Sequence, residues 1–167
     1  MATLVRHRRL ATDSWRLLED AAAALPAAGG VIVPLAAFRA RRDELLARAA
    51  PVGVQLAANE GPEALAADLG RLALVAVHFP KFADGRGFST ARLLRERHGY
   101  AGEIRAVGDV LVDQLLFLER CGFDSFALRD DQDPAAALAA FAALGDAYQG
   151  TVAEPRPLFR RRLGARA

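Results

Sequence analysis

The sequence is poor in the residues that build disulfides and metal clusters. It contains one cysteine, Cys121, and three histidines among 167 residues. A single cysteine excludes an intramolecular disulfide and a cysteine-cluster metal site. No histidine or cysteine lies at ligand spacing from His78, so we predict no bound metal. The sequence also lacks a P-loop, a dinucleotide fingerprint, a flavin or haem motif and a Gly-x-Ser-x-Gly elbow. The cofactor, if the protein uses one, therefore stays unknown at this point.

Long apolar runs are absent as well. No run reaches the roughly 18 residues that a membrane-spanning helix requires, so we predict no contact with a membrane. The first residues are basic, but Thr12, Asp13 and Ser14 interrupt the stretch where an export signal would place its apolar core. These absences predict a cytoplasmic protein, and the length fits one compact domain.

The formal net charge of +2 conceals an uneven distribution. Residues 154–167 contain five arginines and one glutamate, a balance of +4, which leaves the remaining chain near −2. A uniformly basic face of the kind that binds nucleic acid is therefore not expected. The basic tail either is solvated chain or attracts an acidic partner.

From residue 31 onward, short apolar runs alternate with segments of helical periodicity. The longest run, residues 73–79, is typical of a central strand buried on both faces. Asp133 and Pro134 predict the N-cap and first residue of the last helix. The predicted strands are residues 31–33, 52–56, 73–79, 103–107 and 125–128.

This alternation predicts a single α/β domain of about five βα units around a mainly parallel sheet with right-handed crossovers. We expect an open doubly wound sheet. The alternative is a half (β/α) barrel, which would close by dimerisation. Residues 1–30 are expected to form a loosely patterned N-terminal lead-in, residues 31–150 the α/β domain and residues 151–167 a basic C-terminal tail.

Either architecture binds ligands at the C-terminal ends of its strands. After the third predicted strand, Lys81 and Arg86 carry positive charge, while Gly85 and Gly87 permit backbone amides to turn toward a ligand. Ser89 is a candidate N-cap for the next helix, whose N-terminus favours anions. This segment suits a small oxyanion, a phosphate or a carboxylate. The alternative is a glycine turn with a capping serine and two solvated cations.

The segments after the fourth and fifth strands supply further candidates. As a functional residue, Asp109 orients Arg105 or accepts a proton; as a structural residue, it caps the following helix, and the two roles are compatible. Arg105, within a strand, is expected to face a partner carboxylate, and Gln114 is expected to satisfy a buried polar group. His78 is either a general base or simply hydrogen-bonded. The fifth strand is followed by Arg129, Asp130 and Asp131.

A series of motifs from residue 79 to residue 124 resembles one bacterial family, catalogued as domain of unknown function 934. The genes of this family commonly lie beside those of the sulfite reductase haemoprotein and other sulfate-assimilation enzymes. Its members are often labelled probable oxidoreductases on that basis. The family usually carries an acidic residue where this sequence has His78. The motifs are Phe79-Pro80-Lys81-Phe82, Asp84 to Ser89, Ala91 to Arg95, Gly102 to Val110, Asp113-Gln114-Leu115 and Arg120 to Asp124.

The resemblance implies an accessory protein of assimilatory sulfite reduction that acts with sulfite reductase or another sulfate-assimilation protein. The alternative is an enzyme, a probable oxidoreductase, that acts on a small anionic substrate at the strand ends. A purely structural homo-oligomer is the third hypothesis. The matching polar residues are candidates for a shared site, with Asp84 and Asp109 as proton carriers. The candidate ligand-binding residues are Lys81, Arg86, Ser89, Arg92, Arg105 and Gln114.

Overall fold

A computed structural model describes residues 3–143 and 147–164 of the chain. Its strands are β1 (Leu4–Arg6), β2 (Arg9–Ala11), β3 (Trp15–Leu17), β4 (Gly30–Pro34), β5 (Val52–Leu56), β6 (Leu74–Phe79), β7 (Glu103–Gly108) and β8 (Ser125–Ala127). They form one sheet in the order β2-β1-β8-β7-β6-β5-β4-β3. Strands β3 to β8 pair in parallel, whereas β1 is antiparallel to both β2 and β8.

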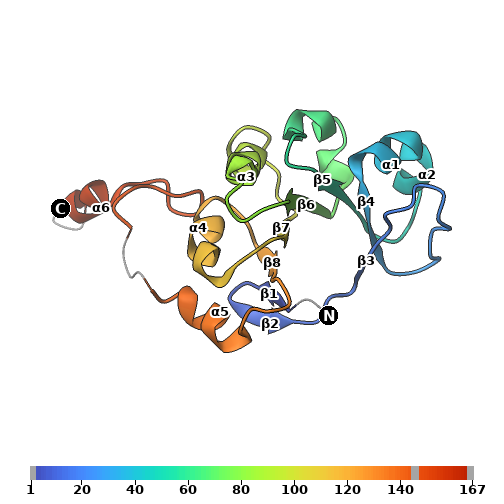
Figure 1. Cartoon of the computed structure of the whole chain (residues 1–167). Coiled ribbons are helices and arrows are strands. Elements are labelled where there is room, and N and C mark those ends of the chain that lie inside the picture. The colour runs from blue at the N-terminus through green and yellow to red at the C-terminus, as the bar shows by residue number, and fades with distance from the viewer. Residues whose placement is uncertain (1–2, 144–146, 165–167) are drawn as a thin grey trace.

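The strand order shows that the predicted doubly wound sheet is wrong. Strands β4 to β8 follow one another across the sheet in chain order, and a doubly wound sheet requires that order to reverse at a switch point. The alternative prediction is confirmed, because the sheet forms a half barrel with α1 to α4 along its outer face (Figure 1). When every crossover is right-handed and each new strand is added on the same side of the last, successive helices all lie on one face of the sheet.

Most of the helices are short. The α-helices are α1 (Leu35–Ala40), α2 (Arg42–Leu46), α3 (Arg86–Glu96), α4 (Leu115–Arg120), α5 (Pro134–Ala140) and α6 (Leu158–Gly164). Three 3₁₀ helices accompany them: η1 (Pro62–Leu65), η2 (Leu69–Arg71) and η3 (Val112–Gln114). Only η1 and η2 connect β5 to β6, so this crossover lacks the predicted α-helix. Between them, the buried Asp68 accepts a 2.9 Å hydrogen bond from Arg42 Nε, a tertiary contact that replaces helical continuation.

The start of α5 agrees with the sequence prediction. The Asp133 carboxylate accepts hydrogen bonds from the amides of Ala135 and Ala136, at 3.1 and 3.2 Å, and Pro134 occupies the first helical position. The spacing of Leu138, Phe141, Leu144 and Tyr148 in the sequence predicts one apolar helical stripe, but the helix ends at Ala140. Phe141 is buried, Leu138 and Tyr148 are exposed, and Leu144 lies outside the described residues.

The predicted lead-in contributes three strands and curls the sheet. Strands β2 and β3 lie at opposite edges, yet only residues 12–14 connect them. Four extended residue steps from Ala11 to Trp15 span at most about 14 Å, whereas the edges of a flat eight-stranded sheet lie about 34 Å apart. The short connection therefore holds the two edges close together and crosses the open side of the half barrel.

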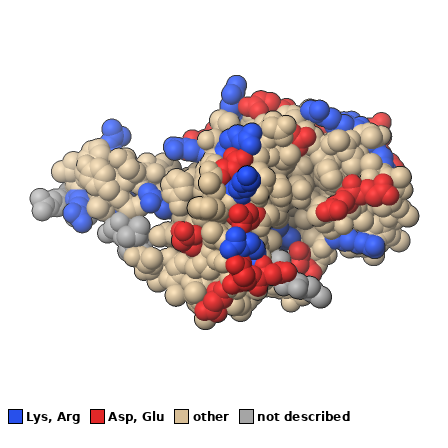
Figure 2. All heavy atoms as spheres, viewed as in Figure 1, with Lys and Arg blue, Asp and Glu red and all other residues tan. Residues whose placement is uncertain are grey.

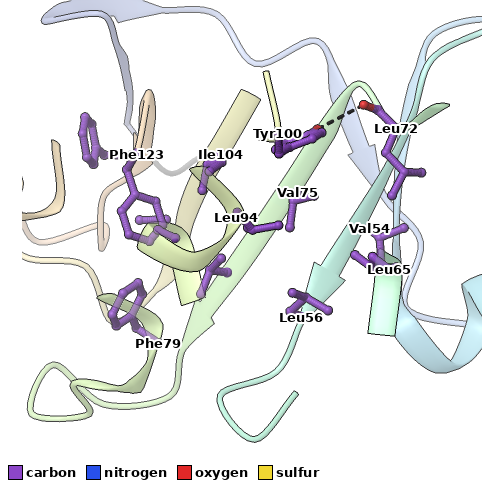
Figure 3. Close-up of a cluster of buried hydrophobic side chains, with 14 of the residues drawn as sticks. Val54, Leu56, Leu65, Leu72, Val75, Phe79, Leu94, Tyr100, Ile104 and Phe123 are labelled. Atoms are coloured by element: carbon purple, nitrogen blue, oxygen red, sulfur yellow. Dashed lines mark hydrogen bonds between the residues drawn. The ribbon is translucent and has the colours of Figure 1, made fainter. Parts of the chain in front are cut away.

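The main core lies between the outer face of the sheet and the helices. Val75 of β6, Ile104 of β7 and Leu94 of α3 are fully buried there, and the Tyr100 hydroxyl donates to the Leu72 carbonyl at 3.1 Å (Figure 3). A smaller apolar cluster fills the inner face of the sheet. It consists of Ile32, Leu74 and Ala76, with Trp15 and Val107 packed against it.

Among residues 3–143 and 147–164, no helix combines the length and the hydropathy needed to cross a bilayer.

Candidate functional site

The C-terminal ends of β6, β7 and β8 are joined through Asp109. Gly108, which ends β7, has φ of +94°, and this turn directs the Asp109 amide onto the Phe79 carbonyl at 2.8 Å. The Asp109 carboxylate then accepts from the Phe82 amide at 2.8 Å and from Arg129 Nη1 at 2.7 Å. Three strand-end loops therefore converge on one carboxylate.

Further hydrogen bonds extend this cluster. Arg129 donates to both oxygens of Asp131, at 2.6 and 2.8 Å, and Gln114 donates to the Phe82 carbonyl at 2.9 Å. The carboxylates of Asp131 and Asp109 raise the pKa of the Arg129 guanidinium above its ordinary value, and Arg129 lowers the pKa of Asp131 to about 2. We call the Phe82 backbone, Asp109, Gln114, Arg129 and Asp131 the strand-end network. It is built of charged groups that already satisfy one another.

Asp109 differs from its predicted roles. It does not cap the next helix, because the first turn of η3 is closed by Gln114, whose Oε1 accepts from the Leu111 amide at 3.1 Å. Its arginine partner is Arg129 rather than Arg105. Arg129 was not among the predicted site residues, although its position directly after the fifth strand was visible in the sequence.

Asp84 and Arg86 form a closed pair at the start of α3. The Arg86 guanidinium donates to the two Asp84 oxygens at 2.9 and 2.6 Å, and the Arg86 amide donates to Asp84 at 3.2 Å. These bonds lower the pKa of Asp84 to about 2. The predicted N-cap Ser89 is wrong, since α3 begins three residues earlier, at Arg86, and Ser89 lies exposed in its first turn. The carboxylate of Asp84 therefore occupies the N-terminus of α3, the position predicted for an external anion.

The two glycines of this segment do not form an anion-binding turn. Gly85 has φ of −80° and ψ of −4°, a right-handed conformation open to any residue. Gly87 is needed for packing, because a Cβ at this position would lie 2.5 Å from Cζ of the buried Phe79. The segment therefore matches the alternative prediction of a glycine turn more closely than the prediction of an oxyanion cradle.

Arg105 lies away from the strand-end network. Its side chain is 2% exposed on the inner face of the sheet. Arg105 Nη1 donates to the two Asp13 oxygens at 2.9 and 3.0 Å, and Nη2 donates to Glu103 at 2.8 Å. Ser125 completes the group, with its hydroxyl 3.3 Å from Arg105 Nε. Glu103 and Ser125 are the first residues of β7 and β8, so this cluster lies at the N-terminal ends of the strands. In β/α barrels, residues at that end stabilise the fold rather than bind substrate.

The other predicted residues are distributed over the surface. Lys81 is exposed, and Arg92 pairs with Glu96 one turn along α3 at 2.9 Å. The structure thus brings together Asp109 and Gln114, pairs Arg86 with Asp84, and separates Arg105 from all of them. A single pocket joining Lys81, Arg86, Arg105 and Asp109, which would favour the enzyme alternative, is therefore not formed.

Two exposed aromatic side chains lie beside the strand-end network. Phe82, in the loop after β6, is 54% exposed and Phe117, on α4, is 53% exposed. The rings of Phe117 and Phe88 are 4.9 Å apart, and Phe88 stacks edge-on against the core residue Phe79 at 5.4 Å. Gln114, which holds the Phe82 carbonyl, lies one helical turn before Phe117. We call Phe82, Phe88 and Phe117 the aromatic surface.

Charges of both signs alternate over the visible face of the molecule. Figure 2 shows lysine and arginine side chains interleaved with aspartate and glutamate down its middle, with no continuous basic face. This agrees with the small net charge of +2. Within the described residues, no group of three or more histidine, cysteine, aspartate and glutamate side chains is arranged to hold a metal ion.

The Asp84–Arg86 pair can be tested by titration. Replacing Arg86 with glutamine should raise the pKa of Asp84 from about 2 toward the ordinary value of about 3.9. Because the folded-state pKa is depressed, the pair stabilises the fold above about pH 4, and this contribution disappears as the pH falls toward 2. Carboxyl ¹³C chemical shifts followed against pH measure the change.

Asp131 is the matched control for this titration. Its pKa of about 2 is held by Arg129, so it should not change in the Arg86→Gln protein. An unchanged Asp84 titration in that variant would show that Arg86 does not hold the carboxylate in solution.

These features define a half-barrel α/β protein whose strand ends are held by internal ion pairs. The family model described as "Bacterial protein of unknown function (DUF934)" matches residues 53–159, and the chain belongs to this family. No curated protein matches the chain. The matched range includes the strand-end network and the aromatic surface, whereas Asp13, which binds Arg105, precedes it.

Proposed function

We propose that this protein is an accessory protein of assimilatory sulfite reduction that binds sulfite reductase, or another protein of sulfate assimilation, through its aromatic surface. The assignment to sulfite reduction rests on the resemblance to a family whose genes lie beside those of sulfite reductase. The exposure of Phe82 and Phe117 is the observation that supports a protein partner.

Aromatic side chains are favoured at protein interfaces, where they bury a large area with few rotatable bonds. Phe117 is backed by Phe88 and, through it, by the core, so its ring is presented on a packed support. Lys81 and Asp113, both exposed, neighbour the aromatic surface in sequence and supply charges for the rim of a contact. An apolar centre with a charged rim is the common arrangement of a specific interface.

The enzyme alternative receives less support from the geometry. It requires several cations to converge on a substrate at the strand ends, yet Arg86 is bound to Asp84 and Arg129 to Asp109 and Asp131. Asp84, with a pKa of about 2, is ionised at neutral pH and has no proton to donate. The proposed role therefore depends on binding a partner rather than on turnover.

Capture of purified sulfite reductase by the immobilised protein, with and without sulfite, tests this proposal. We expect the unmodified protein to retain the reductase in a stoichiometric amount. The Phe82→Ser/Phe117→Ser double variant should weaken the complex at least about tenfold, because the hot-spot side chains of an interface each contribute about 2 kcal/mol or more. Far-UV circular dichroism checks that the variant is folded.

Phe159→Ser is the matched control, since Phe159 is 47% exposed but lies on α6, away from the body of the molecule in Figure 1. It should leave capture unchanged. No capture of the reductase by the unmodified protein would contradict this partner, and equal losses in the two variants would contradict this surface.

A further inference from the structure

A hollow of about 360 Å³ lies on another part of the molecule. It is enclosed by α4, by the turn between β1 and β2, and by the segment 147–161 that leads into α6. Its volume is within the range of sites that hold small molecules. Residues 116–154 of its lining fall within the range matched by the family model.

Most of the charged groups around the hollow already have partners. Arg8 donates to both carboxylate oxygens of Glu119, at 2.9 and 2.8 Å. The Glu154 carboxylate accepts from the Arg156 amide at 3.1 Å, and its own amide donates to the Thr151 hydroxyl at 2.9 Å. The two acidic side chains of the lining are therefore engaged by groups other than Arg120.

Arg120 is the exception. Its side chain makes no hydrogen bond or ion pair with the described residues, and its Nε is shielded from solvent. A shielded donor without an acceptor is costly, and in native proteins such a group is satisfied by a protein group, an ordered water, an ion or a ligand. Arg120 Nε is therefore a donor that an acceptor from outside the chain can satisfy.

The other residues that line the hollow indicate the chemical class of the ligand. Leu116, Ala147 and Ala153 give the hollow apolar walls. The Arg120 guanidinium places one positive charge at the wall of the hollow. We propose that the hollow binds a small organic monoanion, a carboxylate carried on an apolar body, with Arg120 holding the carboxylate.

Benzoate and hexanoate are suitable probes, because each joins one carboxylate to an apolar body. Titrated into the ¹⁵N-labelled protein, at least one of them should shift the amide resonances of Leu116, Arg120 and Thr151. Benzamide, which has the shape of benzoate without the charge, should bind at least about tenfold more weakly, since a hydrogen bond to a charged group contributes roughly 1.5–3 kcal/mol.

Arg120→Gln should weaken the probe by a similar factor. Arg92→Gln is the matched control, because Arg92 pairs with Glu96 on α3 and does not line the hollow. Ala153→Phe, which fills the hollow and keeps Arg120, should also abolish binding. The absence of shifts with both carboxylates, equal binding of benzamide, or equal binding of inorganic sulfate would overturn the proposal. Sulfite reductase is not needed, so this result is independent of the proposed function.

Discussion

Gly108→Ala is expected to lower the free energy of unfolding by about 3 kcal/mol, as measured by urea denaturation. Gly108 has φ of +94°, a conformation that an alanine side chain disfavours. Its Cβ would also lie 2.4 Å from the Phe79 carbonyl oxygen, an atom of the central strand that accepts the Asp109 amide. The substitution therefore disturbs the backbone at the start of the strand-end network.

Substitutions at two other glycines distinguish the cost of backbone strain from the cost of the steric clash. Gly99 has φ of +61° with open space around a Cβ, so Gly99→Ala should cost only about 1 kcal/mol of backbone strain. Gly85 is right-handed with open space, and Gly85→Ala should be neutral within about 0.5 kcal/mol. A loss in Gly108→Ala no larger than that in Gly99→Ala would contradict the clash with Phe79.

Arg105→Ala should destabilise the fold by about 3–5 kcal/mol, because it leaves charged partners without their counter-ion. Glu103 retains the Ser125 hydroxyl at 2.6 Å and Arg6 at 3.6 Å, and Asp13 loses a contact made through both of its oxygens. Guanidinium denaturation monitored by Trp15 fluorescence measures the loss and also reports on the inner face, since Trp15 packs there.

Arg92→Ala is the control for an exposed ion pair and should cost no more than about 0.5 kcal/mol. The Arg105→Met/Glu103→Gln double variant should recover part of the stability lost in Arg105→Ala, because it removes the charge of Glu103, the more buried of the two carboxylates, and fills the space. A loss below about 1 kcal/mol in Arg105→Ala would show that the cluster does not stabilise the half barrel.

The central parallel strands were predictable because their sequences are mainly apolar. Residues 52–56, 74–79 and 103–107 are buried or half-buried at every position, and the predicted strands 52–56, 73–79 and 103–107 agree with the observed ones to within one residue at each end. The N-terminal strands were not predictable in this way. Each has three residues and includes exposed arginines, and β1 pairs with β8 at the far end of the sequence.

The site was harder to predict because partners distant in sequence decide where a charged side chain points. Arg105 was expected at the ligand-binding end, but its place on the inner face directs it to Asp13, which is 92 residues away. Part of the family motif is structural. Arg95 donates to the carboxylate of Asp124 and to the carbonyls of Gly102 and Gly122, at 2.9 and 3.1 Å for the carbonyls, and so ties α3 to the starts of β7 and β8. A shared motif therefore does not by itself mark a shared ligand site.

The pairing of β1 with β8 has a consequence for the order of folding during synthesis. Strands β4 to β7 each find their neighbour soon after it leaves the ribosome, whereas Arg6 pairs opposite Ser125 and must wait for most of the chain. Closing so long a loop is entropically costly and slow compared with local pairing. The nascent chain therefore carries its first hairpin unpartnered, with Val5 of the core uncovered, until β8 emerges and completes the sheet.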